Sequence, residues 1–171
     1  SVPRQSGRPV DAVMRGKAWP RQSELSAFYG SPHGRNGLSS PSWERENLVI
    51  LPSPWALETS WNGQAVRGIR IDRLCAESLA SVLESIWRAA SGDESKIRGW
   101  GMHLFGGSYS FRLMRGANAL SAHAFGCAVD FDPARNGFGD PKPNFAAVPQ
   151  VLRARTSPFG SVAPTYSCSH E

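Results

Sequence analysis

Several features of specialised protein classes are missing from the sequence. No stretch approaches the ~18 apolar residues of a membrane-spanning helix, and the first twenty residues are polar, without the apolar segment of a secretory signal. The chain also has no run of five or more like charges and no recognisable nucleic-acid-binding motif. We therefore expect no membrane insertion and no nucleic-acid partner, while the cellular location stays open.

Cysteine is scarce as well. The three cysteines, Cys75, Cys127 and Cys168, match neither a disulfide scaffold nor a zinc knuckle in their spacing. We expect Cys75 and Cys127 to be small buried hydrophobes. The 171 residues are 40% apolar and include six tryptophans, which predicts one folded domain with a sizeable core. The net charge of +5 suits an anionic partner such as a bacterial wall polymer.

The composition changes along the chain. Residues 1–46 are rich in proline, glycine, serine and arginine, which predicts a loosely structured arm or linker. Residues 47–171 are expected to form the domain. Its clearest element is a helix from about Arg73 to Ala90, because apolar residues recur there at helical spacing. Asp72 is the expected N-cap of this helix, and Gly92 lies just beyond its end.

The strand signals predict an α+β fold, with a small antiparallel sheet and helices packed on one face. The apolar run Leu48–Leu51 is one expected strand. Two further pairs are expected: residues 57–61 with 66–71 through the Asn62-Gly63 turn, and residues 100–105 with 109–114 across Gly106-Gly107.

The segment 121–132 combines a histidine, a glycine turn and a carboxylate. Asp130 lies within an apolar strand, where an unpaired carboxylate would cost several kcal/mol of desolvation. Gly126 and Ala128 leave room beside it, into which His123 can fold back. Imidazole and carboxylate together are suitable zinc ligands. Two other interpretations stay open: His123 and Asp130 form a buried hydrogen-bonded pair, or Asp130 faces solvent.

The spacing of Ser121, His123, Gly126, Ala128 and Asp130 resembles the signature of the zinc D-alanyl-D-alanine carboxypeptidase family. That family includes VanY-type carboxypeptidases and phage endolysins that cleave L-alanyl-D-glutamate bonds. The wider sequence around this string looks like a phage or prophage branch. The resemblance implies the small α+β fold shared with hedgehog signalling domains. It also implies a monomer that uses Zn²⁺ to hydrolyse peptidoglycan stem peptides in the bacterial cell wall, at the periplasm or through delivery by a phage.

The resemblance assigns roles to individual residues. His123 and Asp130 match the first two zinc ligands, and Ser121 matches a substrate-binding residue beside the site. The string Tyr109-Ser110-Phe111-Arg112 resembles the family's Gly-Tyr-Arg strand. Arg112 thereby matches the arginine that holds the substrate carboxylate or stabilises the developing oxyanion.

The family pattern breaks down from about residue 153. The family has a Trp-Gly-Gly stretch, then an acidic general base, then a third histidine ligand three positions later. No Trp-Gly-Gly occurs here, and Ser167 stands three positions before His170. His170 is therefore the candidate third ligand and Glu171 the candidate base. We expect weak peptidase activity or none, because Ser167 cannot act as a carboxylate base.

Two rival functions stay open. A non-catalytic module on the same fold would keep His123 and Asp130 but only bind the cell wall or a protein partner. A basic nucleic-acid-binding domain is the third option, and its DNA binding would depend steeply on salt. For the other ionisable residues, we interpret His33 as a loop residue, His103 as a satisfied strand residue and Asp132 as a strand-end carboxylate.

Overall fold

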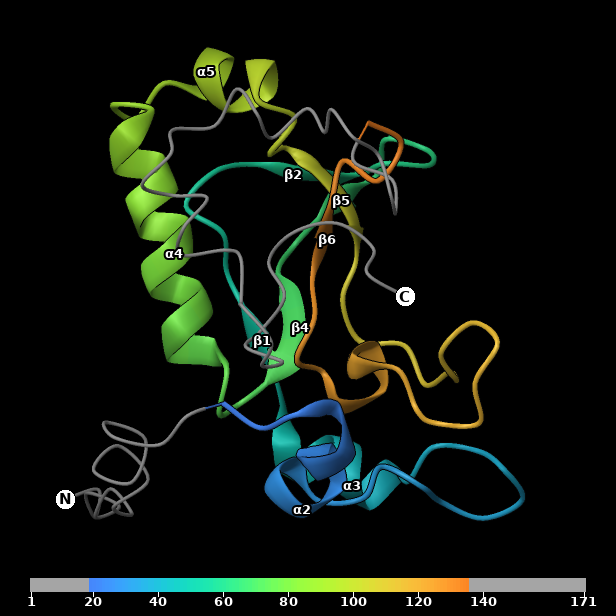
Figure 1. Ribbon diagram of the computed structural model, residues 1–171. Coiled ribbons are helices and arrows are strands. Elements are labelled where there is room, and N and C mark those ends of the chain that lie inside the picture. The colour runs from blue at the N-terminus through green and yellow to red at the C-terminus, as the bar shows by residue number, and fades with distance from the viewer. Residues whose placement is uncertain (1–18, 136–171) are drawn as a thin grey trace, which may run out of the picture.

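The computed structural model describes residues 19–135, so Cys168, His170 and Glu171 lie outside the described residues. The helices are η1 (Gln22–Glu24), α2 (Leu25–Tyr29), α3 (Pro41–Asn47), α4 (Ala76–Ala89), α5 (Glu94–Gly99) and η2 (Ala122–Phe125) (Figure 1). The strands are β1 (Leu48–Leu51), β2 (Leu57–Thr59), β3 (Ala65–Val66), β4 (Ile69–Asp72), β5 (Leu104–Gly107) and β6 (Asp130–Phe131).

The strands form two small sheets. β1 pairs antiparallel with β4, and a second sheet has the order β3-β2-β5-β6. The α+β class expected from the sequence is therefore confirmed. The sheet is not purely antiparallel, however, because β2 and β5 run parallel. A parallel pair needs a long crossover connection, and here α4 and α5 lie in the chain between the two strands.

The predicted hairpin at Asn62-Gly63 is confirmed, with Leu57 opposite Val66. The strand expected over residues 66–71 is instead two strands. A Cβ on Gly68 would lie 2.5 Å from Ile50 Cγ2, so only glycine allows this close approach to β1. Beyond Gly68 the chain leaves β2 and pairs with β1.

The strand pair expected across Gly106-Gly107 is wrong. Both glycines lie inside β5, which pairs with β6 through Phe105 and Phe131. A Cβ on Gly106 would lie 3.1 Å from Asp130 Cβ and 2.9 Å from Pro133 Cδ. The glycines that resemble a turn in the sequence thus permit a close approach between two strands. The segment 109–114 contributes only an isolated bridge from Leu113 to Leu120.

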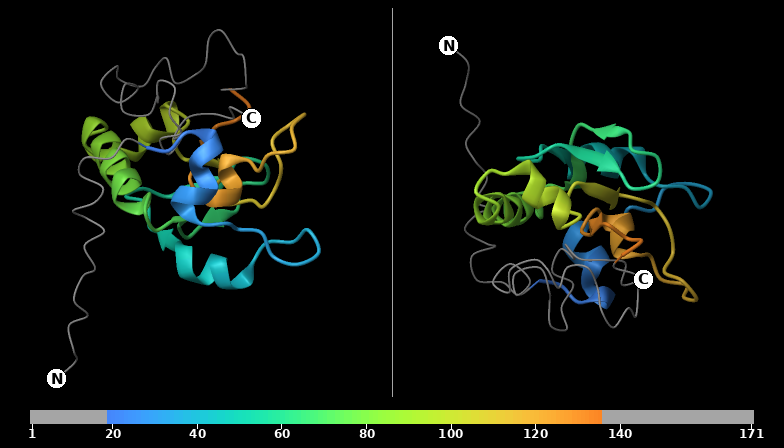
Figure 2. Two further views of the ribbon diagram at one scale, coloured as in Figure 1. Left: turned by 60° about the horizontal axis from the view of Figure 1, so that its bottom comes forward. Right: turned by 90° about the horizontal axis from the view of Figure 1, so that it is seen from above.

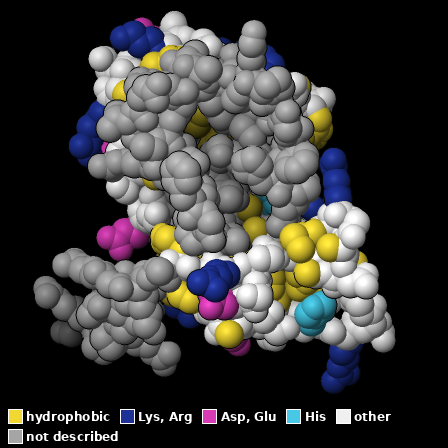
Figure 3. Space-filling view, viewed as in Figure 1, with side chains coloured by type: hydrophobic (Ala, Val, Ile, Leu, Met, Phe, Trp, Pro, Cys, Tyr) yellow, Lys and Arg dark blue, Asp and Glu magenta, His cyan; other side chains and the backbone are white. Residues whose placement is uncertain are grey.

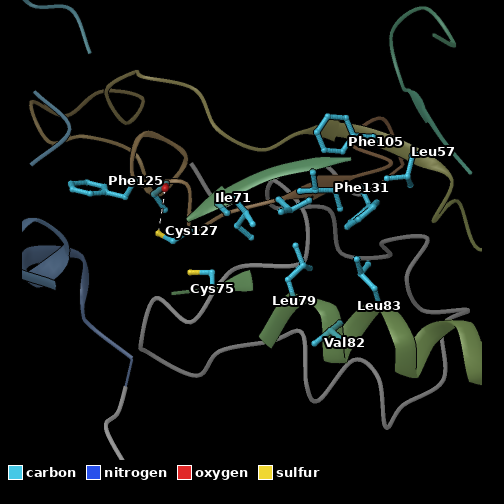
Figure 4. Packing of buried hydrophobic residues seen from close by; sticks show 14 of the residues in the cluster. Leu57, Ile71, Cys75, Leu79, Val82, Leu83, Phe105, Phe125, Cys127 and Phe131 are labelled. Carbon is cyan, nitrogen blue, oxygen red and sulfur yellow. Dashed lines mark hydrogen bonds between the residues drawn. The ribbon is translucent and has the colours of Figure 1, made fainter. Parts of the chain in front are cut away.

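Helix α4 carries the apolar face that its sequence predicts. It runs from Ala76 to Ala89 and starts three residues later than expected. Its N-cap is Cys75 rather than the expected Asp72, which instead accepts from Leu74 N at 2.8 Å in the preceding turn. Its buried residues Leu79 and Leu83 point toward the strands (Figure 4). Cys75 and Cys127 are buried, as expected. Between residues 19 and 135, no helix combines the length and apolarity needed to cross a bilayer.

The N-terminal segment differs from the expected loosely structured arm. From Trp19 to Asn47 it contains short helices that contribute Leu25, Tyr29 and Trp43 to the core. Trp43 Nε1 donates to the Tyr29 carbonyl at 2.9 Å, which ties α3 to α2. Figures 1 and 2 show α2 lying against η2, and the Tyr29 and Phe125 rings are 6.3 Å apart. A few strongly apolar positions outweigh the polar composition of this segment.

Candidate metal centre

The short helix η2 presents His123. At its start, the Ser121 hydroxyl accepts from His123 N at 3.1 Å, and at its end Gly126 has the left-handed φ of +66°. A Cβ on Gly126 would lie 2.6 Å from Leu48 Cδ2 and 2.9 Å from Asp72 N. Glycine is therefore required at position 126 for two reasons: the left-handed φ, and the close approach of its Cα to β4. Ser121 and Gly126 together fix the backbone from which the His123 ring projects.

The structure brings His123 and Asp130 together. His123 Nε2 lies 3.4 Å from Asp130 Oδ2, and the two side chains are 8% and 17% exposed. Asp130 is the first residue of β6 and is paired with Gly107 of β5. The pair is therefore sheltered from bulk water but reachable from it, which excludes the interpretation that Asp130 simply faces solvent.

The Ser108 carbonyl decides which nitrogen of His123 faces Asp130. Nδ1 lies 2.6 Å from that oxygen, and a carbonyl oxygen can only accept, so Nδ1 carries a proton. In a neutral imidazole Nε2 is then an acceptor, and it faces a carboxylate oxygen. Two acceptors in contact repel each other unless a proton or a metal cation lies between them.

The distance from Nε2 to Oδ2 fits a shared metal ion. A charge-assisted hydrogen bond has a typical length of about 2.7–2.9 Å, shorter than the 3.4 Å found here. Two ligands bound to one tetrahedral zinc at about 2.0–2.1 Å lie about 3.3–3.4 Å apart. A carbonyl that holds the other ring nitrogen is also the usual outer partner of a metal-bound histidine. The residues present therefore fit one half of a zinc site.

Ser121 and Arg112 are the two residues expected beside the site, and the structure places their backbones next to each other. Ser121 N donates to the Arg112 carbonyl at 3.0 Å, so the backbones of these two residues are neighbours. The Arg112 guanidinium donates to the Leu113 carbonyl at 3.4 Å and is partly exposed. Ser121 acts on the His123 backbone through its hydroxyl rather than on the ring.

A complete ligand set is not found within the described part of the chain. No group of three or more His, Cys, Asp or Glu side chains that could hold a metal occurs among residues 19–135. The candidates for the third ligand and the base, His170 and Glu171, lie outside these residues. Sequence reasoning missed Ser108, because a backbone carbonyl that contacts a histidine fifteen residues later leaves no side-chain signal.

Other ionisable groups have partners away from this pair. The buried Asp132 accepts from Arg135 Nε at 2.7 Å. His103 lies in the turn before β5 rather than in a strand, and its buried Nδ1 has no hydrogen-bond partner among residues 19–135, so its interpretation as a satisfied strand residue is wrong. Its Nε2 lies 3.8 Å from Glu58 Oε1. Desolvation, with the nearby Arg98, lowers the pKa of His103 and favours its neutral form at physiological pH. Asp132 follows directly after β6, in agreement with its interpretation as a strand-end carboxylate, and it pairs with Arg135.

Comparison with models of protein families, with curated proteins and with solved structures finds no match to the chain.

Proposed function

We propose that this chain is a zinc-dependent hydrolase of peptidoglycan stem peptides, of the D,D-carboxypeptidase or endolysin type, on the hedgehog/D-Ala-D-Ala peptidase fold. The observation that carries the proposal is the 3.4 Å approach of His123 Nε2 to Asp130 Oδ2, with the opposite ring nitrogen held by Ser108. The resemblance of the surrounding sequence to the zinc D-alanyl-D-alanine carboxypeptidases supplies the substrate class.

In this proposal each residue has a separate task. His123 and Asp130 hold the zinc ion, and Ser121 keeps the His123 backbone in place. Arg112 binds the substrate carboxylate or the developing oxyanion, for which its planar guanidinium is suited. Bound zinc would supply Lewis acidity toward the scissile carbonyl and an acidic bound water.

The remaining ligand and the base would come from His170 and Glu171. Adjacent side chains in an extended segment point to opposite sides, so both reach one site only through a turn. A catalytic zinc usually has three protein ligands. We therefore expect zinc binding weaker than at a closed structural site and turnover well below that of a peptidase with a complete ligand set.

A non-catalytic wall-binding module is the second candidate. The observation that favours it is that residues 19–135 hold only the His123–Asp130 part of a ligand set. A nucleic-acid-binding role gains less support. On the face seen in Figure 3, the Lys and Arg side chains are spread singly rather than gathered into one patch.

Metal analysis tests the zinc site. The purified protein should retain about one zinc ion per chain after dialysis, as one tetrahedral site predicts, and His123→Ala and Asp130→Ala should each lose it. His33→Ala is the matched control, because His33 is exposed and stacks edge-on against Phe111 with ring centroids 5.5 Å apart. Equal zinc content in all four proteins would contradict the proposal.

Peptidoglycan assays separate the two candidates. Release of D-alanine or of cleaved stem peptide that requires zinc and disappears in His123→Ala would identify a hydrolase. Zinc-dependent sedimentation with peptidoglycan, without release of any product, would identify the binding module.

A further inference from the structure

Three charged or polar side chains from distant parts of the chain form a closed network. Tyr109 Oη donates to Glu44 Oε1 of α3 at 2.8 Å, and Arg70 Nη2 of β4 donates to Glu44 Oε2 at 2.9 Å. The Arg70 guanidinium carbon lies 4.9 Å from the centre of the Tyr109 ring, which closes the triangle. Each of the three side chains therefore contacts both of the others.

Tyr109 stands between the two residues that hold His123. Its predecessor Ser108 accepts from His123 Nδ1 at 2.6 Å, and its successor Ser110 donates from its backbone N–H to the His123 carbonyl at 3.1 Å. The two neighbours of Tyr109 in the chain thus hydrogen-bond to the ring and to the backbone of His123. The Tyr109 side chain binds the α3 network instead, so it anchors the three-residue segment at its centre.

The anchor itself is rigidly placed. Helix α3 is capped by Ser40, whose hydroxyl accepts from Trp43 N at 3.3 Å, and the Trp43 ring is buried. The Ser39 hydroxyl, and after it Tyr109 and Arg70, lower the pKa of Glu44 and keep it ionised. A charged acceptor on a packed helix is a stronger anchor than a neutral one would be.

We propose that Glu44, Arg70 and Tyr109 are positioning residues for His123. They hold the segment Ser108–Ser110 so that Nδ1 stays hydrogen-bonded and Nε2 stays directed at Asp130. The N-terminal segment, through α3, is then part of the support of the metal site. The metal readout of this inference rests on the proposed function, whereas its readout on the metal-free protein does not.

The test compares Tyr109→Phe and Glu44→Gln with Glu84→Gln. The control breaks the exposed pair between Glu84 and Arg88 on α4, whose atoms are 3.5 Å apart. Zinc affinity is measured by competition with a chromophoric chelator, and the ligand field by the visible spectrum of the Co²⁺-loaded protein. We expect both network variants to bind zinc about tenfold more weakly, at the lower end of the effect that outer partners of metal ligands have. Both should shift the Co²⁺ spectrum, and Glu84→Gln should change neither.

Nitrogen-15 NMR of the His123 ring supplies the readout on the metal-free protein. Wild type should show a slowly exchanging Nδ1 proton, and Tyr109→Phe should speed its exchange or mix the two tautomers. Unchanged ring signals in both network variants would overturn the inference, even if they unfold at lower urea concentration. If wild type binds no zinc but the NMR change occurs, the proposed function fails and the positioning role stands. If wild type binds zinc and the variants match it in every readout, the positioning role fails and the proposed function stands.

Discussion

Two acidic residues at strand ends, Asp72 and Asp130, have opposite surroundings. Asp72 is the last residue of β4 and is fully buried. Its Oδ1 accepts a hydrogen bond from Leu74 N. Its Oδ2 has no hydrogen-bond partner within residues 19–135. Asp130 opens β6, is 17% exposed at its side chain, and places Oδ2 beside the imidazole of His123. Among residues 19–135, the more deeply buried carboxylate is thus the one without an imidazole beside it.

The difference shows that burial alone does not identify a ligand. Burial raises the pKa of Asp72 to about 7. The hydrogen bond from Leu74 N and the nearby charge of Arg73 lower this pKa, but by less than burial raises it. The other ionisable groups that interact with it, Tyr29 and Cys75, are neutral at that pH because burial raises their pKa values too. Asp130 has what Asp72 lacks: an oriented nitrogen at a metal-compatible distance and access to solvent.

One backbone contact joins the two regions. Asp72 N donates to the Gly126 carbonyl at 2.8 Å, and Gly126 ends the helix that carries His123. Variants on either side of this contact therefore test whether the regions act separately.

The largest pH-dependent effect is expected from Asp72→Asn. The folded pKa of Asp72 is about 7, above the ordinary value of 3.8. The folded state therefore binds the proton more tightly, and the contribution to stability is greatest below about pH 4 and falls until about pH 7. The full shift corresponds to about 4 kcal/mol. Asparagine cannot titrate and keeps the acceptor for Leu74 N.

Urea unfolding checks this prediction. The stability of Asp72→Asn relative to wild type should rise by about 2–3 kcal/mol between about pH 5 and about pH 8. Zinc content should not change, because Asp72 is not a proposed ligand. Parallel pH profiles of the two proteins would mean that Asp72 does not titrate in this range.

Gly126→Ala should affect both regions at once. Its φ of +66° strains any residue with a Cβ, and the new carbon would meet Leu48 and the Asp72 backbone. We expect a loss of about 2–4 kcal/mol of stability together with weaker zinc binding. Gly63→Ala is the matched control, since its φ is +70° and no atom lies within 4 Å of the added carbon. Gly63→Ala should lower the free energy of unfolding by about 1 kcal/mol and leave zinc binding intact. Equal losses of stability in the two variants would exclude the contact with β4 as the cause.

Ser121→Ala should have the smallest effect on stability. Removing the hydroxyl that caps η2 should cost about 1 kcal/mol, as for other N-caps. Asp93→Ala, which uncaps α5 by removing the acceptor of Ser95 N, should cost a similar amount. Only Ser121→Ala should also weaken zinc binding, because its cap holds the His123 backbone. Chemical denaturation and metal titration of both variants make the comparison, and equal zinc affinities would confine Ser121 to a structural role.

Part of this molecule was determined by the sequence alone. The strand Leu48–Leu51, the hairpin at Asn62-Gly63 and the apolar face of α4 follow from local spacing, which neighbouring residues enforce through turn and helix geometry. The approach of His123 to Asp130 was expected for the same reason, since a glycine turn separates two residues close in the chain.

Only the tertiary structure decided the rest. The parallel pairing of β2 with β5 and the burial of Leu25, Tyr29 and Trp43 depend on segments that meet across long stretches of chain. Ser108 orients His123 through a backbone carbonyl, an atom that every residue possesses, so no residue type could reveal it. Glu44 meets Tyr109 across 65 positions, and only the packing of α3 against the domain brings that carboxylate within reach of the hydroxyl. Contacts within a few residues are set by covalent geometry, whereas contacts at such separations arise only when the whole core is packed.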